Sequence, residues 1–298
     1  MNLPNLRHLQ YLVALHKYQH FNKAAQASFV SQSTLSSAIV KLEEQMGCQL
    51  IERDHKSFIF TPQGERVVEM ARQLIVNATE MMDFAEQQGD PCKGSIRIGC
   101  IPTIAPYLLT DLVFESQQKL PDLSLYLDED TTENLLLKLA NGDIDTAILA
   151  LPVETGSFQT KVLGKDHFYM AGDKHLIERF KPSQDYEQLP EGSVFLLSDE
   201  HCMTEHALSA CNVEDKTRIH PFSAASISTL VQMTAFHHGF TFLPEMAVKK
   251  GVGQLADIAI EPFKGDRYRE IGMLWRSTSL RRQAFSQIGE IVSNLLEK

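Results

Sequence analysis

The spacing of apolar residues predicts three helices and a short β-hairpin at the start of the chain. Helical periodicity runs through residues 6–13, 22–27 and 31–46. Ser31 is a suitable N-cap for the third helix. The apolar stripe of that helix consists of Leu35, Ile39, Leu42 and Met46. Residues 50–53 and 58–60 have the composition of two short strands, which together predict a wing beside the helices.

The opposite face of the third helix carries small polar side chains, namely Gln32, Ser33, Ser36 and Ser37. Glutamine and serine bond base edges and phosphates, and a polar helix that follows a helix–turn suits the major groove of DNA. The same periodicity fits a generic three-helix unit in which the serines only solvate one face. Periodicity by itself does not separate these two interpretations.

A longer helix is predicted over residues 62–90, where Thr61 is the candidate cap and Pro62 occupies the first position. Its heptad spacing involves Val67, Ala71, Leu74, Ala78, Met81, Ala85 and Gln88. This pattern predicts a coiled-coil seam of about three heptads, and therefore a homodimer. A dimer presents two recognition helices, which suits double-stranded DNA with two half-sites. The alternative is an amphipathic helix that packs on its own domain.

Strand and helix patterns alternate through the rest of the chain. Strands are predicted at residues 96–101, 123–127, 146–151, 195–197, 240–243 and 271–275. Helical segments are predicted at residues 108–113 and 135–139, and an amphipathic helix over 280–295 ends the pattern. This alternation predicts an open, mainly parallel α/β sheet.

Composition and charge limit the class of protein. The net charge of the 298 residues is −10, but residues 1–60 hold six Lys/Arg and four Asp/Glu, so this part is +2 and the rest is −12. A basic head on an acidic body is compatible with DNA binding by the head alone. Neither a membrane span nor a secretory signal is indicated, and the five cysteines lack scaffold-like spacing. We expect a cytoplasmic protein with reduced thiols and no membrane partner. The eleven histidines form no metal-binding pattern, so neither a metal nor a cofactor is expected.

Cys202 directly follows a predicted strand and a histidine, His201, and Cys211 lies nine residues further on. A thiolate is the reactive form of cysteine, and a neighbouring histidine can favour it. Peroxide would convert that sulfur to a sulfenic acid, with which Cys211 could condense. Residues 203–210 are good helix formers, and nine helical steps separate two Cα atoms by about 13 Å. A disulfide needs less than about 7 Å, so bond formation would require unwinding. The alternative is that both cysteines are buried small hydrophobes.

Five ordered runs in the first part of the chain resemble the winged helix-turn-helix of LysR-type transcriptional regulators: 20–25, 30–36, 39–43, 50–53 and 60–64. The resemblance implies that Gln32, Ser33, Ser36 and Ser37 lie in the groove and that Arg53 approaches the DNA backbone. It also implies a winged helix-turn-helix domain (1–61), a linker helix (62–90) and a two-lobed effector domain (94–298), similar to periplasmic binding proteins. The lobes would be residues 94–165 with 268–298, and residues 166–267.

The His201–Cys202 pair, the nine-residue spacing and the run Ile101-Pro102-Thr103 resemble the peroxide-sensing OxyR branch of this family. That resemblance implies Cys202 as the peroxidatic thiol and Cys211 as the resolving thiol. It also implies a hydrogen peroxide pocket formed by Thr103, Thr132 and His201. Glu200 stands where the branch has glycine, so we expect it to alter peroxide sensitivity. A homotetramer and a contact with RNA polymerase are further implications.

We therefore expect a peroxide-responsive DNA-binding regulator of antioxidant genes rather than an enzyme. One alternative is a LysR-type regulator that senses a small metabolite in the cleft between its lobes, with Cys202 idle. Another, from a different class, is a thiol peroxidase. The sequence indicates no docking site for a reductant, and a peroxidase would leave the first sixty residues unexplained.

Overall fold

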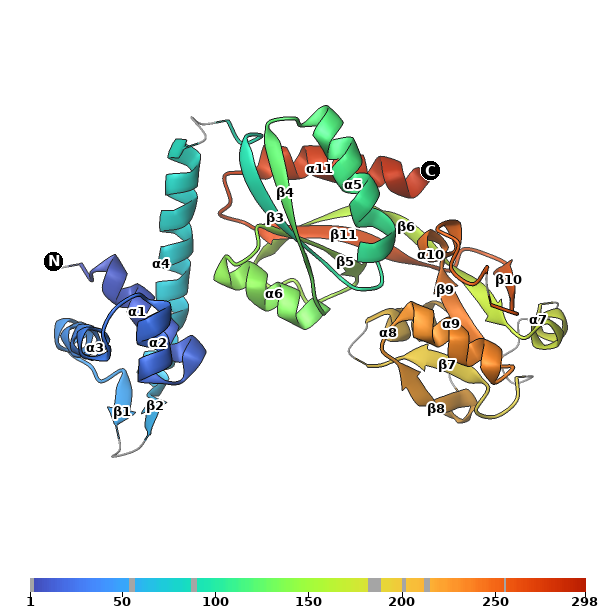
Figure 1. Ribbon diagram of the computed structural model, residues 1–298, viewed down its shortest axis with the longest axis horizontal. Coiled ribbons are helices and arrows are strands. Elements are labelled where there is room, and N and C mark those ends of the chain that lie inside the picture. The colour runs from blue at the N-terminus through green and yellow to red at the C-terminus, as the bar shows by residue number, and fades with distance from the viewer. Residues whose placement is uncertain are drawn as a thin grey trace. The chain divides into compact units, whose positions relative to one another are not determined.

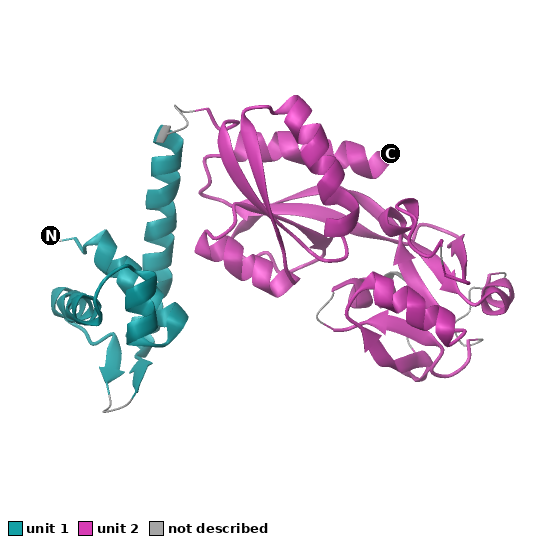
Figure 2. Cartoon of the chain, in the orientation of Figure 1, with its two compact units in different colours: residues 1–89 teal, residues 90–298 magenta. Residues whose placement is uncertain are grey.

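The chain divides into two compact units, residues 1–89 and residues 90–298 (Figure 2). The computed structural model describes residues 3–53, 57–86, 90–181, 189–199, 202–211, 215–254 and 256–298. The first unit has one hydrophobic core, and the second has two. Within the described residues, no helix is both long and apolar enough to cross a bilayer.

The first unit is a winged helix-turn-helix followed by a long helix (Figure 1). Its elements are α1 (Leu6–Tyr18), α2 (Phe21–Ala27), α3 (Gln32–Met46), β1 (Ile51–Arg53), β2 (Phe58–Phe60) and α4 (Pro62–Glu86). The predicted cap of α3 is confirmed, because the Ser31 hydroxyl accepts from the backbone N–H of Thr34 at 3.1 Å. The predicted stripe is confirmed as well: Leu35, Ile39 and Leu42 are fully buried.

The wing joins directly onto α4. β1 and β2 pair antiparallel with Ile51 opposite Phe60. The hydroxyl of Thr61 then accepts from the backbone N–H of Gly64 at 2.9 Å, as expected for an N-cap. A Cβ at Gly64 would lie 2.0 Å from the carbonyl oxygen of Leu50, so glycine is required where α4 passes the wing.

The two halves of α4 have different surroundings. Val68 and Ala71 are each only 1% exposed and belong to the core of the head. The predicted seam is therefore wrong at Ala71, because the first turns of α4 pack on their own domain. Further along the helix, Leu74, Met81 and Phe84 are between 45% and 62% exposed. The apolar surface that a second helix could cover thus begins after the head.

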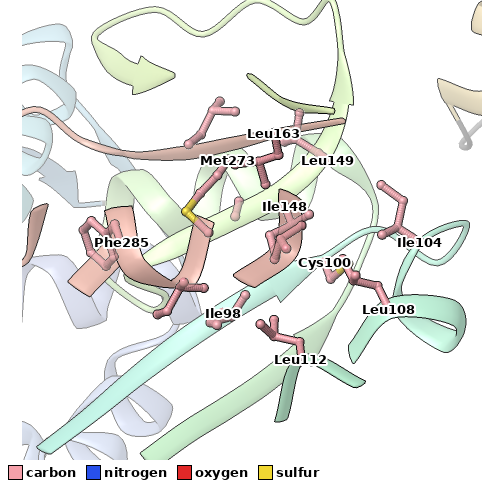
Figure 3. Packing of buried hydrophobic residues seen from close by; sticks show 14 of the residues in the cluster. Ile98, Cys100, Ile104, Leu108, Leu112, Ile148, Leu149, Leu163, Met273 and Phe285 are labelled. Atoms are coloured by element: carbon pink, nitrogen blue, oxygen red, sulfur yellow. The ribbon is translucent and has the colours of Figure 1, made fainter. Parts of the chain in front are cut away.

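The second unit contains two lobes. Lobe 1 contains β3 (Gly94–Cys100), α5 (Ala105–Lys119), β4 (Leu123–Glu129), α6 (Thr132–Asn141), β5 (Thr146–Leu151), β11 (Tyr268–Arg276) and α11 (Arg282–Glu297). Its strands follow the order β4-β3-β5-β11. Side chains on β3 alternate between the two faces: Ile98 and Cys100 lie beside α5 residue Leu112 (Figure 3), whereas a Cβ at Gly99 would meet Leu135 of α6 at 2.5 Å. Helices α5 and α6 therefore cover opposite faces of this sheet.

Lobe 2 has its own core, in which Phe168, Phe240 and Phe242 are almost completely buried. Its elements are α7 (Lys174–Phe180), β7 (Val194–Leu197), α8 (Cys202–Cys211), a 3₁₀ turn (Lys216–Arg218), β8 (Ile219–Ala224), α9 (Ile227–Phe236), β9 (Phe240–Pro244), α10 (Glu245–Lys249) and β10 (Ala259–Pro262). The strand β6 (Phe158–Gly172) connects the lobes, because it pairs with β11 at one end and with β9 at the other.

The sheet is mixed, so the expectation of a mainly parallel sheet is wrong. β3 pairs parallel with β4 and β5, and β7 pairs parallel with β8 and β9. β11 is antiparallel to both β5 and β6, and β6 is antiparallel to β9. These two long strands run between the lobes (Figure 1). The sequence pattern missed β6 because three consecutive polar residues, Gln159, Thr160 and Lys161, interrupt its apolar positions.

Candidate functional site

Helix α8 is shared between the two lobes. Met203 and Ala207 are 2% and 1% exposed and lie in the core of lobe 2. Cys202, one residue before Met203, packs instead against the core of lobe 1. His206 lies one helical turn after Cys202, so these two side chains are on the same side of α8. Helix α8 therefore packs one of its faces against lobe 1 and another face against lobe 2.

The sulfur of Cys202 has one polar contact among the described residues. The hydroxyl of Thr132, the first residue of α6, donates to Sγ at 3.6 Å. The neighbouring Thr131 has a different role, since its hydroxyl accepts from the backbone N–H of Asn134 at 3.5 Å and caps α6. The contact joins two segments 70 residues apart and ties the start of α8 to lobe 1.

A buried arginine lies where β6 and β11 pass between the lobes. The Arg269 and Asp166 side chains are 0% and 1% exposed, and the guanidinium donates to Oδ2 of Asp166 at 3.0 and 2.9 Å. It also donates to the hydroxyl of Thr103 at 2.8 Å and to the carbonyl of Thr103 at 3.0 Å. Oδ1 of Asp166 accepts from the backbone N–H of Met246 at 3.0 Å. A buried ion pair of this kind is tolerated because hydrogen bonds satisfy both partners.

Cys202 opens onto a wide pocket between α6, the segment after β5 and α8. Its polar lining consists of Thr131, Thr132, Glu133, Asn134, Glu154, Asp199, Cys202, Glu205 and His206. Thr103 is not part of this lining, because Arg269 holds it at the strand crossing. The pocket is large enough for a small ligand and carries both a thiol and hydroxyl donors.

The structure brings together only some of the residues predicted for this site. Thr132 contacts the sulfur, and Thr103 is placed against Arg269. Glu200 and His201 lie outside the described residues, and so does the side chain of Cys211. Arg269 and His206 were missed by sequence reasoning. The only available signal for Arg269 was a charge beside the apolar strand pattern that follows it.

Two other cysteines, Cys92 and Cys100, have thiols whose ionisation is disfavoured. Burial raises the pKa of the Cys100 thiol far above its ordinary value, and it also raises the pKa of Cys92. The Cys92 thiol donates to Oε1 of Gln287 at 3.2 Å. Since the thiolate is the reactive form, both residues are expected to be inert toward peroxide.

The candidate DNA surface is the exposed face of α3. Gln32, Ser33 and Ser37 are exposed there, and Ser36 is half-buried. The guanidinium of Arg53 in β1 donates to the Ser36 hydroxyl at 2.9 Å and lies 5.3 Å from the centre of the Phe21 ring. The wing thus places a cation beside the polar face of α3, where a phosphate could be bound.

Two family descriptions match the chain: "Bacterial regulatory helix-turn-helix protein, lysR family" over residues 6–65 and "LysR substrate binding domain" over residues 90–296. The chain is 34% identical to the HTH-type transcriptional regulator EstR of Acinetobacter baylyi, over 98% of this chain and 97% of that protein. It is also 34% identical to the hydrogen peroxide-inducible genes activator of Haemophilus influenzae, over 97% of this chain and 96% of that protein.

The reduced regulatory domain of OxyR2 from Vibrio vulnificus is 48% identical in sequence and superposes with a TM-score of 0.66, covering 69% of this chain and 97% of that one. The two family descriptions match the winged helix-turn-helix and the two-lobed unit, and the two full-length relatives align with at least 97% of this chain. The chain belongs to the LysR family of transcriptional regulators, in its OxyR branch.

Proposed function

We propose that this chain is a DNA-binding regulator that hydrogen peroxide switches through a disulfide between Cys202 and Cys211. The Cys202 sulfur attacks one peroxide oxygen, the O–O bond breaks, and the other oxygen leaves as water after taking the thiol proton. The Cys211 thiol then displaces hydroxide from the sulfenic acid, and its proton completes a second water. The Thr132 hydroxyl supports this assignment because it can orient a peroxide beside the sulfur. Thr103 and His201 are proposed as further peroxide ligands.

The winding of α8 carries the proposal. The helix begins at Cys202 and ends at Cys211, which separates their Cα atoms by about 13 Å. A disulfide requires less than about 7 Å, so it cannot form while the helix is intact. Unwinding removes Cys202 from Thr132 and from the core of lobe 1. The chemistry is thereby coupled to the contact between the lobes.

We further propose that the regulator is a homodimer through the exposed apolar positions in the second half of α4, including Leu74 and Met81. Each recognition helix α3 would then read one half-site with Gln32, Ser33, Ser36 and Ser37, while Arg53 binds the backbone. Association of two dimers would let a conformational change in the regulatory units alter the spacing of the heads.

A DNA footprint with reduced and oxidised protein tests this function. We expect protection of two half-sites in both states and a change in the protected positions after stoichiometric peroxide, with mass spectrometry showing a Cys202–Cys211 disulfide. Identical footprints despite a complete disulfide would contradict the switch. Absence of any Cys202 oxidation would favour a regulator that binds a small metabolite in the pocket, and rapid multi-cycle turnover of peroxide with a thiol reductant would favour a peroxidase.

Glu200 is proposed to set the peroxide sensitivity. Replacing Glu200 with glycine is expected to change the rate constant of Cys202 oxidation by about threefold or more. A faster reaction would indicate that the carboxylate disfavours the thiolate through like charge. A slower reaction would indicate that Glu200 shapes access to the sulfur. Stopped-flow measurement with limiting peroxide distinguishes these results, and an unchanged rate would end the proposal.

A further inference from the structure

We propose that His206 makes the redox equilibrium of α8 depend on pH, because its imidazole is docked without a proton on Nδ1 while α8 is wound and binds that proton when α8 unwinds. This inference rests on the disulfide proposed above. It concerns how the same site is regulated and assigns a role to a residue that the peroxide chemistry does not use.

The docked position of His206 follows from its hydrogen bonds. Its ring bonds to the backbone of Pro152 in lobe 1. Proline has no backbone N–H, so the acceptor is the carbonyl oxygen and the imidazole donates. Nδ1 is buried and has no hydrogen-bond partner among the described residues. We assign the donor as Nε2–H, since Nδ1 has no hydrogen-bond partner in the part of the chain that the structure describes.

The surroundings of His206 oppose its protonation while it is docked. Burial lowers the pKa of the imidazole below its ordinary value, and the Arg269 guanidinium on β11 lowers it further. The Pro152 carbonyl and the Glu205 carboxylate act in the opposite direction but do not outweigh these effects. Four other charged or titratable groups line the same pocket. They are Glu133 on α6, Glu154 after β5, Asp199 before α8 and Cys202 on α8.

Unwinding of α8 changes this environment. His206 and Cys202 lie on the same side of the helix and both depend on its winding for their place against lobe 1. A released imidazole regains water and its ordinary pKa of about 6.5. Because the docked pKa is the lower of the two, protonation stabilises the released state as the pH falls below about 6.5 and has no effect well above it. Acid should therefore favour the disulfide.

Exchange with glutathione isolates this effect. The reaction of the dithiol with glutathione disulfide gives the protein disulfide and two molecules of glutathione, so the thiol protons balance. The equilibrium constant would be measured between pH 7.5 and 5.5 for the full-length protein and for His206→Gln, whose amide can still donate to Pro152 but does not titrate. The ratio of the native constant to the variant constant removes any titration of Cys202 that both proteins share.

We expect this ratio to rise by about fivefold to tenfold as the pH falls from 7.5 to 5.5. His175→Gln, at an exposed position on α7, is the matched control and should leave the pH dependence unchanged. His206→Asn provides a second non-titrating variant if the first folds poorly. A ratio that stays constant while the Cys202–Cys211 disulfide forms would overturn the inference but not the proposed function. Failure to form that disulfide at any pH would overturn both.

Discussion

Replacing Cys202 with serine is expected to abolish the response to peroxide. A serine hydroxyl does not react with peroxide under these conditions, so the conversion of the reduced DNA footprint should slow by about a hundredfold or more. The variant should keep the reduced fold, because serine has a similar size and can also accept from Thr132. The measurement is the DNA footprint before and after stoichiometric peroxide, together with intact-protein mass spectrometry.

Two matched variants locate the effect at this sulfur. Cys92→Ser removes a thiol that is hydrogen-bonded to Gln287 and whose reactivity is suppressed by burial, so peroxide should still switch the footprint. Cys211→Ser should let Cys202 reach the sulfenic acid without forming the internal disulfide, and the footprint should then stay in its reduced form. A Cys202→Ser protein that still changes its footprint would refute the assignment of the sensing thiol.

The second large effect is expected at the strand crossing between the lobes. Asp166→Asn would leave the buried Arg269 guanidinium without its countercharge, and the loss should be about 3–5 kcal/mol in the free energy of unfolding. The loss of the Asp166 carboxylate should also release Thr103, because the Arg269 guanidinium that binds Thr103 would no longer be held in place. Urea denaturation of the reduced protein, followed by circular dichroism and fluorescence, measures this change.

The double variant Asp166→Leu with Arg269→Met separates charge from packing. Replacing both partners by apolar side chains removes the uncompensated charge, so this protein should be more stable than Asp166→Asn. Glu69→Gln breaks an ion pair between two exposed side chains on α4 and should change the stability little. If Asp166→Asn were as stable as the native protein, the buried ion pair would not stabilise the pairing of β6 with β11.

Local patterns predicted much of the fold. The cap and stripe of α3 and the apolar runs of β3 and β5 follow from helical and strand periodicity, which neighbouring residues encode. β6 has no such signal, because three consecutive polar residues interrupt its first half and its pairing depends on β9 and β11. The direction of β11 was equally hidden, since a strand's own residues do not reveal whether its neighbours run parallel or antiparallel.

The sequence by itself determined the arrangement on which the proposed chemistry rests: a cysteine after a strand, a second cysteine nine positions later and a helical segment between them. Only the tertiary structure decided which side chains meet. Arg269 reaches Asp166 across 103 positions, Thr132 reaches Cys202 across 70, and His206 bonds to Pro152 of the other lobe. These contacts depend on how two lobes assemble around β6 and β11, and residue spacing along the chain carries no record of that assembly.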